Sequence, residues 1–562
     1  MEELLSNKSG KKIILLGNEA IVRGALESGV QFVSTYPGTP SSEIGNTFFK
    51  IAPKTGVYFE FSTNEKVALE AAIGASFSGL KTLMAMKNFG TNVALDALLP
   101  FVYTGTKAPT VIISADDPSC HSSAQSEENT RGISYLAHIP TLEPADPQEC
   151  KDFVKLGFQI SEKFKIPVMI RTTTRVAHQR GIVTLNKVQF SKSKTPKGRF
   201  IKDYKKFVTL PPRVMEMKTE LLEKLEKIKD FAEKSHINKQ SSRKSNYGII
   251  TSGISYLYVM EALKELNLDL PVLKLGFFYP LPEKKIKNFI SRASRQRGKA
   301  RDEGFTLSDQ KLKKILIVEE LEPFLEKEVK ILAKEVNCKL EVVGKKLISE
   351  VNELKPGIVT SAVAKFTNRK YKMPSVKLKI QAPKRFPQLC PGCPYWLVIS
   401  AVKKAVDTKN VIFGGEIGCY MLFGNPPVDL QDYLSCMGSS VGIAHGIKKS
   451  TGQKVIAFVG DSSFFHSGIP PLINTVFNKS NPLIIILNNE TTAMTGHQPH
   501  PGAPVTPNGI NIENIVRGCG VKYVKTLDPV NQEEFVQTVK EFLEKPEVSV
   551  IISKRACIQI KK

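Results

Sequence analysis

Two apolar runs near the C-terminus decide the fold: KVIAFVGDSS (454–463) and PLIIILNN (482–489). Each run is short, rich in β-branched residues and almost free of charge, which is typical of a strand buried on both faces of a parallel sheet. Asp461 follows the first strand and Asn489 follows the second. In a parallel sheet, we therefore expect both polar groups at the carboxyl ends of strands, where ligands bind.

An Asp carboxylate and an Asn amide oxygen in this position are hard ligands for Mg²⁺, which commonly bridges to phosphate groups. Gly460 lets the backbone approach a diphosphate, and the helix expected after HSG (466–468) offers its amino end to the same group. Gly460-Asp461-Ser462 alone carries no information. The two strands, each with its polar end, predict a magnesium–diphosphate site.

Strand-like and helix-like segments alternate along most of the chain, which predicts a multidomain α/β protein with doubly wound parallel sheets. In the first part, we expect KIILL (12–16) as a strand, NEAIVRGALESG (18–29) as a helix, and Thr39-Pro40 as the cap of the next helix. Further along, VLKLGFF (272–278) is expected as one strand. The predicted organisation is an α/β domain at 1–190, a charged helical linker at 191–245, a second α/β domain at 246–370 with a basic insertion at 291–313, and a third at 371–562.

Composition excludes several classes of protein. The 562 residues are 41% hydrophobic and 24% charged, the balance of a globular protein that folds without disulfides. The apolar runs are far shorter than the roughly 20 residues of a membrane span, and the start lacks a secretory pattern, so we expect a cytoplasmic protein that binds no membrane. The net charge of +25 is spread over segments that read as linkers and surface, which favours solvated surface over nucleic-acid binding.

Motifs along the whole chain resemble the large (alpha) subunit of indolepyruvate:ferredoxin oxidoreductases, which depend on thiamine diphosphate. They are YPGTPSSEI (36–44), NEKVALEAAIGAS (64–76), ADDPSCHSS (115–123), CPGCP (390–394), EIGCY (416–420), CMGSSVGIAHG (436–446) and GDSSFFHSGIPPLINTVFNKSNPLIIILNNETTAMTGHQPHPG (460–502). The resemblance implies that the three α/β domains are, in order, a pyrimidine-binding domain, a transketolase-C-like middle domain and a diphosphate-binding domain.

The resemblance also implies roles for single residues in cofactor binding. Asp461, Asn489 and the Thr491 carbonyl would bind Mg²⁺, and Glu65 would hydrogen-bond the aminopyrimidine ring of the cofactor. A carboxyl group at that ring favours its imino tautomer, which can accept a proton. Alternatively, Glu65 is an acid at a helix start, favoured by the helix dipole. The other cofactor-binding residues that the resemblance implies are Gly418, Cys419, Gly438, Gly460 and Ser462.

Three residues are candidates for contact with the substrate. Thr39 would lie at a helix amino end, a site for the carboxylate of a 2-oxoacid, or would serve only as an N-cap. His121 and Ser122 would line the pocket, with a structural role as the alternative. Pyruvate-oxidising relatives carry an arginine just before these residues, whereas SADDPSC (114–120) has none. This departure favours a substrate with a bulkier, aryl side chain.

The nine cysteines of a cytosolic chain are thiols, catalytic groups or metal ligands rather than disulfides. Cys390, Cys393, Cys419 and Cys557 match in order and approximate spacing the ligands of a [4Fe–4S] cluster in related oxidoreductases. Thiolates at such spacing suit an iron–sulfur cluster or zinc, and plain thiols are a further alternative. Cys436 is the rival fourth ligand.

Together these features predict oxidative decarboxylation of an aryl 2-oxoacid (indolepyruvate or phenylpyruvate type) to an acyl-CoA, with CoA as co-substrate. The resemblance implies a small beta subunit as partner, ferredoxin as electron acceptor, and a homo- or hetero-oligomer. Two departures from the sequence pattern of the family bear on this prediction. The family usually carries a C-terminal domain with two ferredoxin-type cysteine runs, which the chain does not show before it stops at CIQIKK (557–562), so we expect electron transfer to be shortened or supplied by another subunit. In addition, Tyr395-Trp396 follows CPGCP where the family has His-Arg.

Two other functions stay open at this point. One is a 2-oxoacid decarboxylase that transfers no electrons, which the missing ferredoxin domain favours. The other is a cofactor-binding subunit without turnover, against which the retention of Glu65, Asp461 and Asn489 argues.

Overall fold

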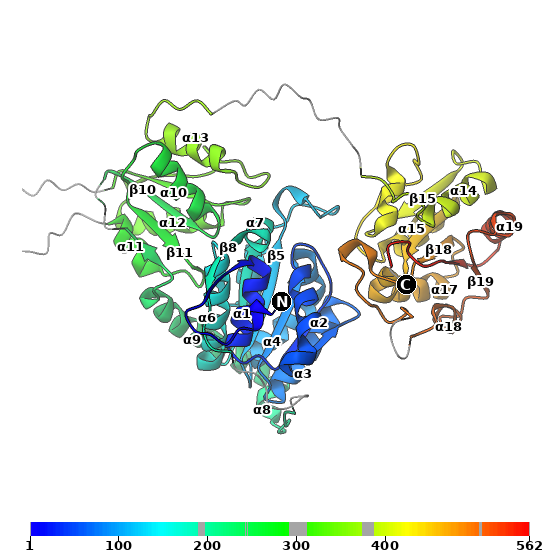
Figure 1. The fold of residues 1–562 in the computed structure, drawn as a ribbon, viewed down its shortest axis with the longest axis horizontal. Helices are drawn as coiled ribbons and strands as arrows, with labels where there is room; N and C mark the ends of the chain where they lie inside the picture. Colours follow the sequence, from blue (N-terminus) through cyan, green and yellow to red (C-terminus); the bar gives the residue numbers. More distant parts are fainter. Residues whose placement is uncertain are drawn as a thin grey trace, which may run out of the picture. The chain divides into compact units, whose positions relative to one another are not determined.

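The computed structural model describes residues 2–188, 197–241, 243, 245–291, 312–373, 387–504 and 509–560. The chain divides into two compact units, a larger one of residues 1–60 and 65–377 and a smaller one of residues 61–64 and 378–562. Figure 1 shows that both units combine helices with sheets, which confirms the predicted α/β class. The expected basic insertion at 291–313 lies almost entirely outside the described residues.

A seven-stranded sheet forms the first part of the larger unit. Its strands are β2 (Phe32–Thr35), β3 (Tyr58–Phe61), β4 (Thr82–Lys87), β5 (Thr110–Asp116), β6 (Thr141–Leu142), β7 (Val168–Thr173) and β12 (Phe277–Tyr279). They lie in the order β12-β6-β7-β5-β4-β2-β3. β2, β4, β5 and β7 pair in parallel, so their carboxyl ends form one edge of the sheet. The helices are α1 (Gly17–Glu27), α2 (Ser42–Thr55), α3 (Glu65–Phe77), α4 (Asn88–Thr104), α5 (Arg131–Ala137), α6 (Pro147–Phe164) and α7 (Thr174–His178).

The first predicted strand forms but does not join this parallel sheet. β1 (Lys12–Leu16) pairs antiparallel with β8 (Arg180–Thr184) in a separate two-stranded ribbon. Burial alternates along β1, and Ile14 is 67% exposed. A strand with one solvated face suits an antiparallel ribbon, whereas the interior of a parallel sheet buries both faces. The expected place of KIILL in the parallel sheet is therefore wrong.

A second sheet of the larger unit contains β9 (Lys239–Gln240), β10 (Tyr247–Ser252), β11 (Val272–Leu275), β13 (Lys314–Val318) and β14 (Glu341–Val343). Its order is β14-β13-β10-β11-β9, with only β9 antiparallel among these strands. The single strand expected at 272–278 divides at Gly276, because β12 turns away to pair with β6 of the first sheet. The Asn238 side chain accepts hydrogen bonds from the N–H groups of Gly276 (2.8 Å) and Phe277 (3.0 Å) at this division. The helices of this part of the larger unit are α10 (Ser255–Glu265), α11 (Glu283–Ile290), α12 (Phe324–Val336) and α13 (Pro356–Phe366).

The charged stretch expected as a linker contains a long, packed helix, α9 (Arg213–Lys234). Its buried residues recur every three or four positions, as on one face of an amphipathic helix: Met217, Leu221, Leu225, Ile228 and Ala232. Phe231 packs edge-on against Phe164 and Phe277. The helix therefore contributes to the core of the larger unit. The domain boundaries themselves stay predictions.

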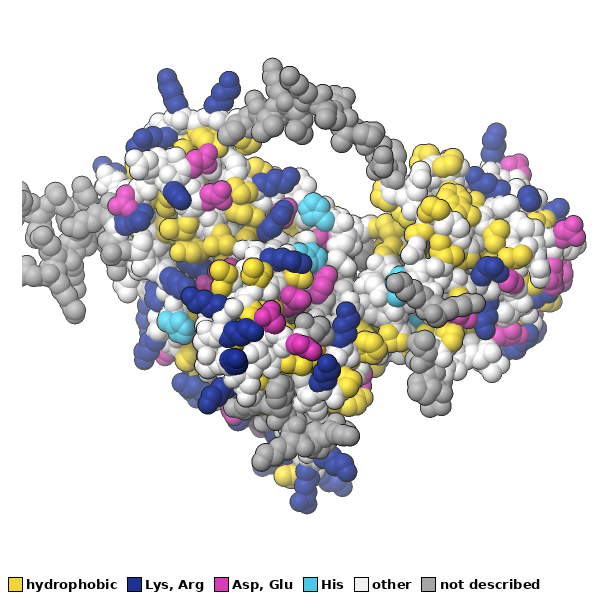
Figure 2. All heavy atoms as spheres, viewed as in Figure 1, with side chains coloured by type: hydrophobic (Ala, Val, Ile, Leu, Met, Phe, Trp, Pro, Cys, Tyr) yellow, Lys and Arg dark blue, Asp and Glu magenta, His cyan; other side chains and the backbone are white. Residues whose placement is uncertain are grey.

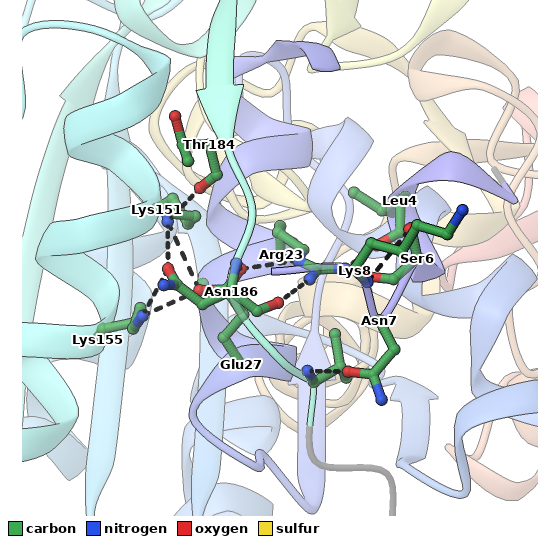
Figure 3. Close-up of polar contacts among 12 residues, drawn as sticks. Leu4, Ser6, Asn7, Lys8, Arg23, Glu27, Lys151, Lys155, Thr184 and Asn186 are labelled. Carbon is green, nitrogen blue, oxygen red and sulfur yellow. Dashed lines mark hydrogen bonds and ion pairs between the residues drawn. The ribbon is translucent and has the colours of Figure 1, made fainter. Parts of the chain in front are cut away.

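A buried group of charges holds the first residues of the chain against α1 (Figure 3). The Arg23 guanidinium donates to the carbonyls of Leu4 (2.6 Å) and Ser6 (2.8 Å) and to the Glu27 carboxylate (2.9 Å). Burial opposes the charge on Glu27, but the N–H of Asn186, at 2.7 Å, and the Arg23 guanidinium outweigh it and lower the pKa of Glu27. This group has a structural role, since its donors and acceptors satisfy one another.

The smaller unit is built on a six-stranded sheet. Its strands are β15 (Val411–Gly415), β16 (Tyr433–Leu434), β17 (Lys454–Gly460), β18 (Leu483–Asn488), β19 (Tyr523–Leu527) and β20 (Ser549–Lys554). They lie in the order β16-β15-β17-β18-β20-β19, and every neighbouring pair is parallel. β17 and β18 are the two strands from which the sequence argument started, and β18 is buried throughout. The longer helices are α14 (Tyr395–Ala405), α15 (Ser439–Thr451), α17 (Ile469–Phe477), α18 (Ile512–Gly518) and α19 (Gln532–Leu543).

One face of the molecule shows how its basic residues are distributed. On the face shown in Figure 2, Lys and Arg side chains are distributed among acidic and apolar ones. Within the described ranges, no helix has both the length and the apolar character needed to cross a membrane.

Candidate active site

The predicted magnesium ligands follow two neighbouring strands of the smaller unit. β17 and β18 pair in parallel, with Gly460 opposite Leu487. Asp461 is the next residue after β17, and Asn489 is the next residue after β18. Both side chains are buried, with exposures of 2% for Asp461 and 6% for Asn489. The structure therefore brings these residues together at the carboxyl edge of the sheet.

Hydrogen bonds join the two strand ends into one network. The Asp461 carboxylate accepts bonds of 2.8 Å from the backbone N–H groups of Ser462 and Glu490. The Asn489 side chain accepts a bond of 3.3 Å from the N–H of Thr491, which is also buried. The network thus includes all three residues that the resemblance assigns to the metal.

Three glycines assigned to the cofactor lie where chain segments pack closely. Gly438 has φ = +77°, and a Cβ there would lie 2.5 Å from the carbonyl carbon of Ser467. At Gly460 and Gly418, a Cβ would lie 2.9 Å and 2.3 Å from the Tyr420 ring. A side chain at any of these positions would displace its neighbours. Cys419, another residue of this set, begins a short 3₁₀ helix, Cys419–Gly424.

Glu416, a buried acid at this edge, was not selected from the sequence. It directly follows β15, is fully buried, and accepts hydrogen bonds from the N–H groups of Gly438 (3.1 Å) and Gly460 (3.4 Å). The Tyr420 hydroxyl donates to the same carboxyl group. Burial raises the pKa of Glu416 to about 7. The signal was present in the sequence, since Glu416 opens the EIGCY motif immediately after an apolar strand.

His500 is a second residue that the sequence argument missed. Its imidazole is buried, and Nε2 lies 3.1 Å from the Asp461 carboxylate. Nδ1 accepts a hydrogen bond of 3.2 Å from the N–H of Gly502, whereas Nε2 has no hydrogen-bond partner among the described residues. The sequence does not predict the contact between His500 and Asp461, because His500 does not directly follow β17 or β18 in the chain.

The four cysteines assigned to a cluster lie near one another in the smaller unit. Burial, together with the charges of Cys390 and Cys557, raises the pKa of the Cys393 and Cys419 thiols to about 11. The backbone N–H of Cys557 donates to the carbonyl of Asn489 at 3.0 Å, so the C-terminal segment returns to the magnesium site. Cys557 is thus the fourth thiol of this neighbourhood. Within the described residues, however, no three His, Cys, Asp or Glu side chains are already arranged to hold a metal ion.

Glu65, in the larger unit, is the first residue of α3 and is 6% exposed. Its position at a helix start agrees with the alternative of a dipole-favoured acid. Its carboxyl group also packs against α4, where a Cβ at Gly90 would lie 2.6 Å from Oε1 of Glu65. Because Gly90 has no side chain, it leaves space for the Glu65 carboxyl group.

Thr39 does not cap a helix, contrary to the expectation. The Gly38 carbonyl accepts hydrogen bonds from the N–H (2.8 Å) and the hydroxyl (2.7 Å) of Ser41, which closes a turn over Thr39-Pro40. Because of this turn, α2 begins only at Ser42. The half-buried Thr39 therefore lies in the loop between β2 and α2.

The two candidate pocket residues after β5 separate. Ser122 lies beside Thr39, with its hydroxyl 3.5 Å from the Thr39 carbonyl, and its N–H donates to the Asp117 carboxylate at 2.8 Å. His121 instead faces Glu353, with 3.4 Å between Nε2 and the carboxylate, and its side chain is 52% exposed. The structure thus groups Ser122, but not His121, with Thr39.

Known proteins resemble the chain in both units. Residues 416–553 match the family described as thiamine pyrophosphate enzyme, C-terminal TPP binding domain, and residues 23–239 match the pyruvate flavodoxin/ferredoxin oxidoreductase, thiamine diphosphate-binding family. The chain is 43% identical to indolepyruvate oxidoreductase subunit IorA of Methanothermobacter thermautotrophicus, over 99% of this chain and 89% of that protein. It is 40% identical to the IorA subunit of Archaeoglobus fulgidus, over 99% of this chain and 88% of that protein. A solved 2-oxoglutarate:ferredoxin oxidoreductase from Magnetococcus marinus is similar over 63% of this chain and 65% of that chain, with 16% identity and a TM-score of 0.48.

The matched families and the α/β fold define the class: a thiamine-diphosphate-dependent 2-oxoacid oxidoreductase. Similarity over nearly the whole chain then gives the family. The chain belongs to the family of indolepyruvate oxidoreductase subunits IorA, as its motifs predict.

Proposed function

We propose that this chain is the thiamine-diphosphate subunit of an enzyme that oxidatively decarboxylates an aryl 2-oxoacid, such as indolepyruvate or phenylpyruvate, to an acyl-CoA. The observation that carries the proposal is the buried network that joins Asp461 and Asn489 at adjacent strand ends, in a chain of the IorA family. The absence of arginine from SADDPSC (114–120) supports a substrate with a bulky side chain.

The donor set at these strand ends fits Mg²⁺ and a diphosphate. A carboxylate, an amide oxygen and a backbone carbonyl are the hard oxygen ligands that this cation takes. Asp461, Asn489 and Thr491 would hold the metal. The residues that would contact the cofactor are Gly418, Cys419, Gly438, Gly460 and Ser462. When bound, thiamine diphosphate supplies the stabilisation of the carbanion that decarboxylation produces.

Glu65 would hold a proton at the aminopyrimidine ring of the cofactor. A carboxyl group can share that proton with a ring nitrogen, and this exchange contributes typically 10²- to 10⁴-fold to rates in enzymes. The packing of Glu65 against Gly90 supports this role, because it fixes the carboxyl group against α4. Thr39 and Ser122 would contact the substrate, whereas the position of His121 beside Glu353 favours a structural role.

A [4Fe–4S] cluster on Cys390, Cys393, Cys419 and Cys557 would relay the two electrons of the oxidation one at a time to ferredoxin. The chemistry of four neighbouring thiols fits such a cluster. Because burial keeps the Cys393 and Cys419 thiols protonated at neutral pH, binding must release protons and draw the sulfurs together. Anaerobically purified protein, assembled with its partner, should contain about four irons per chain, and Cys390→Ser should lower that content. Zinc in place of iron would contradict the cluster.

The enzyme would work in the cytoplasm as an oligomer with a small beta subunit. CoA would accept the acyl group, and ferredoxin would accept the electrons. Similarity to IorA subunits, which are named as subunits of a larger oxidoreductase, supports the second chain.

A decarboxylase without electron transfer is the second candidate, because Tyr395-Trp396 follows CPGCP where the family has His-Arg. The purified complex, given phenylpyruvate, CoA and oxidised ferredoxin, distinguishes the two functions. Formation of phenylacetyl-CoA with reduced ferredoxin supports the oxidoreductase. Release of CO₂ with an aldehyde, and no reduced ferredoxin, supports the decarboxylase.

A further inference from the structure

Lys87 is the last residue of β4 and stands immediately before α4, at the carboxyl edge of the seven-stranded sheet. β5 lies on one side of β4 and β2 on the other. The segments that follow these two strands carry Asp117 and Thr39. Lys87 therefore occupies the middle of the edge where ligands of parallel sheets bind.

The ammonium group of Lys87 lies among the candidate substrate residues. Nζ donates to the Ser122 carbonyl at 2.8 Å and lies 3.9 Å from the Asp117 carboxylate. The stem of the side chain packs under the turn that carries Thr39, since a Cβ at Gly38 would lie 2.9 Å from the Lys87 Cβ. Only 12% of the side chain is exposed. The charge is thus mostly withdrawn from solvent yet reachable.

This ammonium keeps spare hydrogen-bonding capacity. A lysine has three N–H donors, and among the described residues Nζ makes one hydrogen bond, to a neutral carbonyl. The nearby Asp117 carboxylate already accepts bonds from Ser122 N–H (2.8 Å), the Ser123 hydroxyl (2.7 Å) and the Thr174 hydroxyl (2.6 Å). Asp117 is therefore bound elsewhere and only partly offsets the lysine.

The residue next to Lys87 gives a second, independent indication of a ligand. Asn88 is fully buried, yet neither polar atom of its side-chain amide has a hydrogen-bond partner within the described residues. Buried polar groups in folded proteins are nearly always paired, and an unpaired one requires a water, an ion or a ligand. An amide nitrogen without a partner can donate to an oxyanion, as the Lys87 ammonium can.

We propose that Lys87 binds the carboxylate of the 2-oxoacid substrate. This inference rests on the proposed function and deepens it. A charge-assisted hydrogen bond from Nζ would hold the carboxylate beside Thr39 and Ser122. Lys87 then determines selectivity for acids over neutral analogues.

Burial lowers the pKa of Lys87 to about 8, against the opposing effect of the acids and thiol that face it: Asp117, Cys120, Glu128 and Glu65. The ammonium form therefore predominates at neutral pH and is lost above pH 8. In the wild-type complex, KM for phenylpyruvate should rise as the pH passes from 7.5 to 9.5, approaching tenfold for each pH unit above the pKa. A KM that stays constant over this range contradicts the inference.

The decisive variant is Lys87→Met in the assembled complex. Loss of one charge-assisted bond should raise KM for phenylpyruvate about 10- to 100-fold, with a smaller change in kcat. Inhibition provides a second readout that needs no turnover of the ligand. Wild type should bind 3-phenylpropionate more tightly than 3-phenylpropionamide, and Lys87→Met should lose this preference, while Lys87→Arg should retain part of it.

Lys81→Met is the matched control. Lys81 stands just before the other end of β4, its Nζ donates to the Ser28 carbonyl at 2.7 Å, and burial lowers its pKa as well. This variant should keep the wild-type KM and acid preference. If the wild type decarboxylates no 2-oxoacid, the proposed function fails. If the wild type is active and Lys87→Met keeps both KM and the acid preference, the Lys87 inference alone is overturned.

Discussion

The two units present opposite charges at the same position of similar sheets. At the carboxyl edge of the seven-stranded sheet, a mostly buried ammonium, Lys87, lies against a backbone carbonyl. At the corresponding edge of the six-stranded sheet, the buried acids Asp461 and Glu416 accept hydrogen bonds from backbone N–H groups. We call these the lysine edge (Thr39, Lys87, Asn88 and Ser122) and the acid edge (Glu416, Asp461, Asn489 and Thr491).

The comparison shows that the sheet fixes where a ligand binds, while the residues after each strand decide which ligand it is. The lysine edge is prepared for an anion such as a carboxylate. The acid edge, with its oxygen ligands, is prepared for a divalent cation and the phosphates that it carries. Each prediction below alters one unit and leaves the other intact.

The largest effect is expected at the acid edge, from Asp461→Ala. This change removes one proposed metal ligand and the acceptor of two backbone N–H groups, so affinity for Mg²⁺ and thiamine diphosphate should fall at least about 100-fold. Cofactor content after gel filtration and titration calorimetry measure it. Asp528→Ala, at a surface ion pair with Arg555, is the control and should bind normally. Unchanged cofactor affinity in Asp461→Ala would remove the assignment of this site.

Glu65→Gln should separate binding from chemistry. The amide can still accept or donate a hydrogen bond at the aminopyrimidine ring, but it cannot exchange the proton, so turnover should fall about 10²- to 10⁴-fold with the cofactor still bound. Stopped-flow rates and cofactor content are measured on the same sample. Near-wild-type rates would return Glu65 to the role of an acid at the start of α3.

Gly90→Ala should have a smaller effect through the same carboxyl group. The new Cβ would lie 2.6 Å from Oε1 of Glu65, so the carboxyl group must move, and we expect a loss of about tenfold in kcat without loss of cofactor. Gly74→Ala, in α3, is the matched control, because no atom lies within 4 Å of its new Cβ. It should keep full activity and gain up to about 1 kcal/mol of stability. Equal rates in the two variants would show that Gly90 has no positioning role.

The smallest effect concerns pH. Glu416 has an ordinary pKa of 4.5 and a pKa of about 7 in the folded protein. The folded state thus holds this proton more tightly than the unfolded state. Its contribution to stability is complete below pH 4.5 and is lost as the pH rises through 7. In the cofactor-free protein, Glu416→Gln should therefore flatten the fall in Tm between pH 5 and 8.

The exposed Glu533→Gln, in α19 of the same unit, is the control for this pH dependence and should reproduce the wild-type slope. Parallel Tm curves for the wild type and Glu416→Gln would show that burial does not perturb Glu416.

The acid edge could be predicted further than the lysine edge, for a physical reason. Asp461 and Asn489 each follow an uninterrupted apolar run, so the sequence places both at strand ends and their shared edge follows from parallel pairing. Lys87 also ends a strand, but a lone lysine after TLMAM is ordinarily a solvated residue. The turn at Gly38 and the carbonyl of Ser122, both distant along the chain, help to withdraw it from water.

The errors in the predicted fold also arise from contacts that the local sequence pattern does not encode. KIILL has the composition of a buried strand, yet its partner is β8, more than 150 residues away, which local pattern does not encode. Thr39-Pro40 has the composition of a helix start, but the hydrogen bonds of Ser41 to Gly38 close a turn instead. The contact of His500 with Asp461 joins residues distant along the chain, so local pattern does not predict it.

The central claim is that the enzyme couples decarboxylation to electron transfer. Measuring all products of the anaerobically assembled complex tests it most directly. With phenylpyruvate, CoA and oxidised ferredoxin, the account predicts CO₂ and phenylacetyl-CoA in equal amounts, with two electrons delivered to ferredoxin for each acyl-CoA formed. Release of CO₂ with an aldehyde and without reduced ferredoxin would contradict it.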